Sequence, residues 1–325
     1  MHTTLKWLAP ALLLAGPALT APALAQNYPA RAVNIVAPFA PGGSTDIIAR
    51  AMAAELTRLW GQPVLVENRA GGNSIIGTEV VAKAAPDGYT ILNAAATFAT
   101  NVGLYDSKLP YDIFRDFAPV LLINTTPLAM TVYPGLPAKS VKELIALAKA
   151  KPGQMNFGSS SLGGINHLAG ELFNMMAGVK MVHVPYKGNA PALTDLMGGR
   201  LDFVFNGTTS VLSQLQSGKL RALAVSTPKR ASSLADVPTL DESGLKGFDA
   251  AGWNAWVVPA KTPATLVAKL NADGNKALMM PDMQKRLIAD GSETAGGTPD
   301  VLAAYLREEA SKWAKVIKAG NIRPE

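Results

Sequence analysis

Small and polar residues that follow a short apolar run form the first candidate binding site. The run Val33–Val36 is rich in β-branched residues and predicts a buried strand. Apolar residues from Ile48 to Leu59 then recur at helical spacing, and Ser44 or Thr45 can cap that helix. A helix N-terminus behaves as about half a positive charge and exposes backbone N–H groups, which suits an anion. We interpret the segment as a loop that binds a carboxylate; the alternative is a turn that only reverses the chain. The candidate residues are Phe39, Pro41, Gly42, Gly43, Ser44, Thr45 and Asp46.

A second segment repeats this order of strand, small-residue loop and helix start. A brief strand is expected at Met155–Phe157, and a helix with one apolar face follows the loop Gly158–Gly164. The candidate residues of this loop are Ser159, Ser160, Ser161 and Gly163. One of the serines could instead be only the helix cap. His167 is a further candidate, although a histidine near a helix start is more often a capping or packed group than a ligand contact.

Residues at other strand ends would line the same space. Ligands of parallel sheets bind beyond the carboxyl ends of the strands. The ends of the strands Tyr89–Leu92 and Leu201–Phe205 supply small and polar candidates, as does the loop after the strand Met181–Val184. These candidates are Ala94, Ala95, Thr97, Lys187, Asn206 and Thr208. Lys187 either balances the charge of a ligand or is simply solvated, and the others could be ordinary turn residues.

The order of elements predicts an α/β protein with two lobes. Strands and helices alternate from residue 33 to residue 97, which indicates parallel strands with right-handed crossovers. Two apolar runs, split by Asn124–Pro127, mark the expected crossing into a second lobe, and a strand near Trp253–Val258 returns to the first. Helices are expected from Pro263 to Ile317. The predicted division is 26–125 plus 250–325 for the first lobe and 126–249 for the second.

The first 25 residues differ from the rest of the 325-residue chain. Lys6 precedes the apolar stretch Leu8–Leu19, and Ala23–Ala25 fits a signal-peptide cleavage site. Prolines interrupt the stretch, which argues against a membrane anchor. We therefore expect a signal peptide (residues 1–25) cleaved after Ala25, and a periplasmic protein.

The composition narrows the function further. The chain contains no cysteine, so disulfides and thiolate metal sites are excluded. Its formal charge of +6 suits small anions, but the basic residues are scattered and form no stripe with aromatic residues, so no nucleic-acid partner is predicted. No metal site and no cofactor motif stands out, and we expect neither.

Six motifs in fixed order resemble the substrate-binding proteins of tripartite tricarboxylate transporters, the Bug or TctC-like family. They are Tyr28–Arg31, Pro38–Asp46, Val66–Arg69, Pro86–Tyr89, Pro185–Gly188 and Asp236–Thr239. The resemblance covers essentially the whole chain after the signal peptide. One departure is Ala70–Ser74, where family members often carry a proline-glycine-alanine-glycine run.

The family resemblance implies a fold, a ligand and a partner. The fold would be that of a periplasmic binding protein of type II, with a mostly parallel, helix-flanked sheet in each lobe, two crossovers and a ligand cleft between the lobes. The protein would bind a small mono-, di- or tricarboxylate through the loops Phe39–Asp46 and Ser159–Gly163, with ordered waters, and deliver it to the permease subunits in the membrane. A monomer is expected.

Two other functions compete with this interpretation. A serine hydrolase would need a Gly-x-Ser-x-Gly elbow, and the segment Gly158–Leu162 lacks the last glycine. Only His167 and His183 remain after signal removal, and neither has an evident aspartate partner. A sensor partner that presents the ligand to a membrane kinase would use the same fold, and the sequence does not separate this role from transport.

Overall fold

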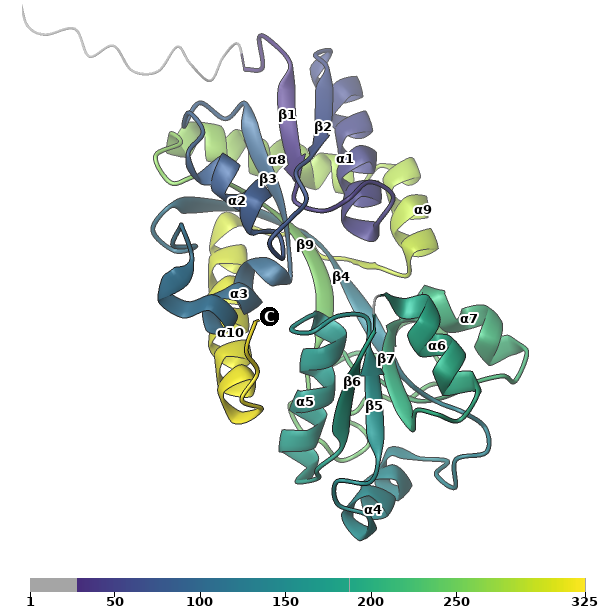
Figure 1. Cartoon of the computed structure of the whole chain (residues 1–325). Coiled ribbons are helices and arrows are strands. Elements are labelled where there is room, and N and C mark those ends of the chain that lie inside the picture. The colour runs from purple at the N-terminus through teal and green to yellow at the C-terminus, as the bar shows by residue number, and fades with distance from the viewer. Residues whose placement is uncertain (1–27, 187, 325) are drawn as a thin grey trace, which may run out of the picture.

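The computed structural model describes residues 28–186 and 188–324, so the signal peptide and Lys187 lie outside the described residues. Figure 1 shows two lobes joined by long strands that run from one to the other. The two-lobed α/β fold expected from the sequence is confirmed, and a single ten-stranded sheet extends through both lobes. No helix in the described ranges is both long and apolar enough to span a bilayer.

Three parallel strands build the first lobe. The strands β1 (Val33–Ala37), β2 (Val64–Asn68) and β3 (Thr90–Ala95) pair in the order β2–β1–β3. The helices that follow these strands are α1 (Ser44–Trp60), α2 (Ile75–Ala82) and α3 (Thr97–Tyr105), with a 3₁₀ turn η1 (Asp106–Lys108) after α3. The predicted parallel order is confirmed, so the carboxyl ends of β1 and β3 share one edge of the sheet.

Two antiparallel strands connect the lobes. Strand β4 (Phe117–Val132) pairs with β9 (Ala251–Pro259) along residues 117–127 and with second-lobe strands from Leu128 onward. The two apolar runs on either side of 124–127 form one continuous strand rather than two, and the crossing was expected near the point where β4 changes partners. Pro127 lies where β4 changes partners, a position at which a strand tolerates a missing N–H. The short strand β10 (Glu293–Thr294) also pairs with β4.

The second lobe repeats the parallel arrangement on the other half of β4. Strands β5 (Asn156–Ser159), β6 (Val182–Pro185) and β7 (Phe203–Gly207) pair as β6–β5–β7, and β7 and β8 (Arg221–Val225) are antiparallel to β4. The remaining elements are α4 (Val141–Ala150), α5 (Ile165–Ala177), α6 (Asn189–Met197), α7 (Thr208–Gln216) and η2 (Ser232–Leu234). Each lobe therefore contains three mutually parallel strands, whereas β8 and the two strands that cross between the lobes pair antiparallel with their neighbours.

Three helices complete the chain: α8 (Ala264–Leu278), α9 (Pro281–Asp290) and α10 (Pro299–Ala319). Helix α10 contributes to the apolar cores of both lobes. Leu302 and Leu306 pack with first-lobe residues, whereas Trp313 and Ile317 pack with residues of the second lobe. Trp256 is fully buried in the first-lobe core, as the apolar surroundings of its position predict.

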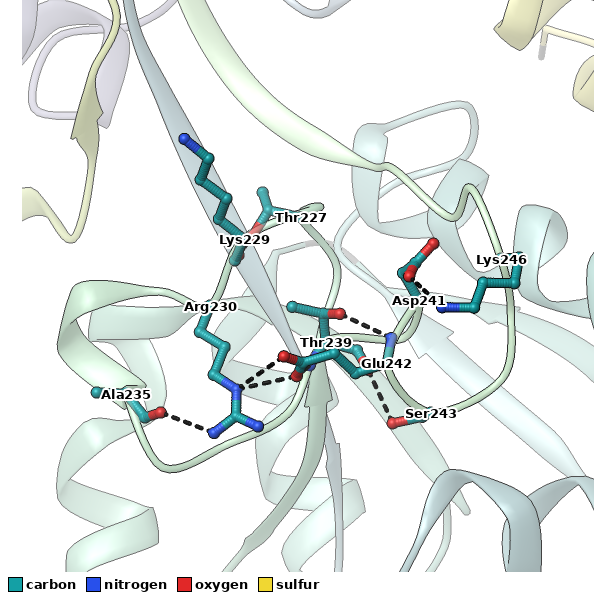
Figure 2. A network of polar contacts seen from close by, with 9 residues as sticks. All are labelled: Thr227, Lys229, Arg230, Ala235, Thr239, Asp241, Glu242, Ser243 and Lys246. Carbon is teal, nitrogen blue, oxygen red and sulfur yellow. Dashed lines mark hydrogen bonds and ion pairs between the residues drawn. The ribbon is translucent and has the colours of Figure 1, made fainter.

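The return crossing, residues 226–250, is a folded segment rather than a loose linker. Figure 2 shows Arg230 paired with Glu242, which also accepts a hydrogen bond from the backbone N–H of Thr239 at 2.8 Å. Backbone bonds from Leu240 to Val225 of β8 and from Ser226 to Leu128 of β4 tie the segment to the sheet. The exposed ion pairs add little energy individually, so the backbone bonds hold this crossing in place.

Candidate functional site

The β1–α1 loop presents open backbone to solvent at the start of α1. Gly43 is the N-cap and Ser44 is the first helical residue; the structure shows no side-chain cap on this helix. The predicted capping by Ser44 or Thr45 is therefore wrong. Residues 41–44 are exposed, and Gly42 has a φ of +87°, a conformation that favours glycine. Phe39 and Thr45 are half-buried on either side of this exposed stretch.

Asp46 lies beneath this loop and holds it. The residue is 3% exposed, and its carboxylate accepts hydrogen bonds from the backbone N–H of Gly42 at 3.0 Å and from Asn68 at 2.9 Å. Arg50 pairs with the same carboxylate at 3.0 Å. Burial opposes ionisation, but these bonds outweigh it and hold the pKa of Asp46 below its ordinary value. The side chain thus orients the loop from the protein side.

The carboxyl end of β3 lies at the same edge of the first-lobe sheet as the β1–α1 loop. Ala94 is buried and Ala95 half-buried, and Thr97 begins α3, a helix that the sequence analysis missed because small residues showed no periodicity. The Thr97 hydroxyl lies 2.7 Å from that of Ser74, at the start of α2. Asn93 is fully buried and donates to the Thr45 carbonyl at 3.0 Å, which links β3 to the start of α1.

The second-lobe loop is held from within. Ser159 is fully buried and donates to the Ser161 carbonyl at 2.8 Å, while Ser160 is half-buried and Ser161 exposed. Gly164 is the N-cap of α5 and no side chain caps that helix in the structure, so the alternative role of a serine as helix cap is wrong. Gly163 is buried with a φ of +71°, and a Cβ there would lie 2.8 Å from Leu104 of α3.

Two histidines support the ends of this loop. His167 is 3% exposed, and its Nδ1 accepts a hydrogen bond from the Gly163 N–H at 2.9 Å. His183 Nε2 lies 2.7 Å from the Ser159 hydroxyl. Their rings are stacked with centroids 3.6 Å apart. Burial, and then the neighbouring His167, lower the pKa of His183 to about 3. The sequence alone assigns His183 no binding role, because strand β6 brings this residue beside the loop only when the chain is folded.

A further helix begins at the end of β7. Asn206 is fully buried, and its Oδ1 has no hydrogen-bond partner among the described residues. Thr208 is the first residue of α7, a helix that was not predicted. Because β5 and β7 are parallel neighbours, the starts of α5 and α7 lie at the same edge of the second-lobe sheet.

The turn after α9 connects the helix starts of the two lobes. The Ser44 hydroxyl donates to the Asp290 carboxylate at 2.8 Å. From the second lobe, Thr209 donates to the Asp290 carbonyl at 3.1 Å, and the Thr208 hydroxyl lies 3.5 Å from the Gly291 carbonyl. The turn thus brings the α1 and α7 starts into one polar network, and the sequence carried no signal for it.

Several polar side chains of this region already donate within the protein, such as Ser44 to Asp290 and Ser159 to the Ser161 carbonyl. No group of three His, Asp or Glu residues in the described ranges is placed to hold a metal ion. The backbone N–H groups at the helix N-termini are the donors that this arrangement leaves for an anion. A dicarboxylate could be held by charge-assisted hydrogen bonds of about 1.5–3 kcal/mol each.

Comparisons with known proteins agree with this architecture. The model of the tripartite tricarboxylate transporter family receptor (TctC) matches residues 48–322. The protein BugT of Bordetella pertussis is 37% identical over 308 residues, covering 94% of each chain. The structure of Rpa4515 from R. palustris with adipate is 37% identical, with a TM-score of 0.77 over 92% of this chain and 100% of that one. MatC (Rpa3494) from Rhodopseudomonas palustris, with bound malate, is 33% identical, with a TM-score of 0.73 over 89% and 100%. The chain belongs to the tripartite tricarboxylate transporter receptor family.

Proposed function

We propose that this protein is a solute-binding protein that captures a small carboxylate between its lobes and delivers it to a tripartite tricarboxylate-type permease. The observation that carries the proposal is the set of helix N-termini at the carboxyl edges of both lobes, α1 and α3 in one and α5 and α7 in the other. Each N-terminus favours negative charge. Relatives of known structure with adipate and malate support the ligand class.

We propose different roles for the residues of the site. The loop residues other than Asp46 and Ser159, together with the residues at the strand ends, would contact the ligand or its bound waters. Asp46, Ser159 and His167 are buried and would support the loops instead. The contact positions proposed are Phe39, Pro41, Gly42, Gly43, Ser44, Thr45, Ala94, Ala95, Thr97, Ser160, Ser161, Gly163, Lys187, Asn206 and Thr208.

The remaining features of the proposal follow from the sequence and the family. A signal peptide cleaved after Ala25 would export the chain to the periplasm. The lobes would comprise 26–125 plus 250–325 and 126–249, and the protein would act as a monomer without a cofactor. A role as the ligand-presenting partner of a membrane kinase is the alternative use of the same fold.

The Ser159–His183 contact raises the competing function of a serine hydrolase, and its geometry argues against one. A nucleophilic serine must reach its substrate, but Ser159 is fully buried and its hydroxyl already donates to the Ser161 carbonyl. The base in such a pair is normally oriented by a carboxylate. The group stacked on His183 is the imidazole of His167.

A thermal-shift screen of residues 26–325 against small carboxylates tests the proposal. We expect one or a few acids, with adipate, malate and citrate among those screened, to raise the melting temperature, because a ligand that binds only the folded state stabilises it. The same acids should be recovered chemically unchanged after incubation. A panel without any shift would contradict the proposed ligand class, and conversion of an ester or amide analogue would contradict the non-enzymatic role.

A further inference from the structure

We propose that His167 and His183 are positioning residues that hold the two ends of the Ser159–Gly163 loop in its ligand-binding shape. The inference rests on the proposed function, since it assumes that this loop contacts the ligand. Neither imidazole needs to touch the ligand for this role. The atoms that donate and accept at the two ends of the loop determine what each histidine does.

His183 holds the first end of the loop. The Ser159 hydroxyl gives its proton to the Ser161 carbonyl at 2.8 Å, so its oxygen can only accept from His183 Nε2 at 2.7 Å. The neutral imidazole must therefore carry its proton on Nε2. Backbone bonds from Tyr186 to the Ser159 carbonyl and from Gly188 to the Ser160 carbonyl fix the same end against the segment after β6.

His167 holds the second end with the opposite polarity. Its Nδ1 accepts from the backbone N–H of Gly163 at 2.9 Å, so the neutral ring carries its proton on Nε2. That Nε2 lies 3.8 Å from the Glu171 carboxylate on the same helix. Gly163 has a left-handed φ of +71°, and a Cβ there would lie 2.8 Å from Leu104 of α3, so the loop passes close to the first lobe at this residue. The His167 bond therefore fixes the point at which the loop faces the first lobe.

Both rings are also held by their neighbours. They are stacked on each other with centroids 3.6 Å apart, and the Phe157 ring of β5 lies against both. This packing fixes the orientation of each imidazole, so that its ring nitrogen meets the end of the loop that it supports.

Paired variants separate positioning from packing. H167N keeps an acceptor at the place of Nδ1 and H183Q keeps a donor at the place of Nε2, whereas H167L and H183L keep only bulk. N174A is a matched structural control. The Asn174 side chain, near the C-terminal end of α5, exchanges two hydrogen bonds with the backbone of Met181 just before β6, far from the loop. The acid that gives the largest shift with the wild-type protein in the carboxylate screen serves as the probe, measured by titration calorimetry.

We expect H167L and H183L to weaken binding by about three- to tenfold each at about pH 7.5, which corresponds to the net loss of one hydrogen bond. H167N and H183Q should restore affinity to within about twofold.

Three results would overturn the inference. The leucine variants could bind as tightly as the wild type, H167N and H183Q could bind as weakly as the leucine variants, or N174A could weaken binding as much as H167L does. If the wild-type protein binds none of the acids, the proposed function has failed, and that outcome is distinct from all three. Melting temperatures of every variant identify those that are merely unfolded.

Discussion

The buried carboxylate of Asp46 provides the sharpest test of the proposed carboxylate site. A negative charge beside an anion site should weaken binding by repulsion if it faces the ligand. The structure instead gives Asp46 a supporting role, because its carboxylate accepts bonds from Gly42 and Asn68 and is only 3% exposed. Replacing Asp46 by alanine therefore distinguishes the two effects.

The expected magnitude follows from these contacts. The two charge-assisted bonds from Gly42 and Asn68 contribute about 1.5–3 kcal/mol each. The pair with Arg50 adds less than about 1 kcal/mol, because the Arg50 side chain is 51% exposed. Part of this total is offset, since removing the carboxylate also removes the penalty for burying it. We expect D46A to lower the free energy of unfolding by about 2–4 kcal/mol, and D46N, which keeps the shape, by about half as much.

Urea unfolding measures the stability of each variant, and calorimetry measures the affinity for the carboxylate found in the screen. Both variants should bind more weakly than the wild type, with D46A the weaker, because the Gly42 N–H loses its orientation. The control is E79A, which removes an exposed pair with Lys83 and should change stability by less than about 0.5 kcal/mol. Unchanged stability of D46A, or tighter binding by both Asp46 variants, would refute the supporting role.

Three further predictions concern other parts of the chain. G43V should abolish carboxylate binding, because a larger side chain would block the ligand from the backbone of the loop. Its melting temperature should stay close to that of the wild type, because Gly43 has an ordinary φ of −80° and open space around a Cβ. Unchanged affinity would remove Gly43 from the site. G163A should destabilise the protein more than G153A in urea unfolding. Both glycines have a left-handed φ, which costs an alanine about 1–2 kcal/mol. Only at Gly163 would the new Cβ also lie within 3 Å of a side chain, that of Leu104. The free energy of unfolding should fall as the pH is lowered from about 6.5 towards 3, because the unfolded chain protonates His183 in this range while the folded chain keeps it neutral. H183Q should flatten this part of the pH profile of the unfolding free energy. An unchanged slope would exclude His183 as its source.

The sequence predicted the parallel strands of both lobes because their apolar runs end in glycine or other small residues. The change from a β-branched run to helical spacing after Val36 marked α1 correctly. Strand β4 was divided wrongly, since Asn124–Pro127 has the composition of a turn while its pairing with β9 keeps it extended. Long-range pairing overrode local preference there.

The candidate site was predictable only where its residues are neighbours in the chain. Glycines and serines at helix starts carry a local signal, so the loops after β1 and β5 were found. The helices α3 and α7 were missed because each begins among small and polar residues without an apolar period. Contacts such as Ser44 with Asp290, or Ser159 with His183, join distant segments, and no spacing rule in one sequence indicates them.

Helix α10 has a mechanical consequence for the lobes. Its first half shares the core of one lobe and its last two turns share the core of the other, and a Cβ at Gly103 of α3 would lie 2.8 Å from the Ala314 backbone. Helix α10 therefore packs into the cores of both lobes beside the strands that cross between them. A movement of one lobe relative to the other would have to shift apolar side chains of α10, Trp313 among them, against their neighbours.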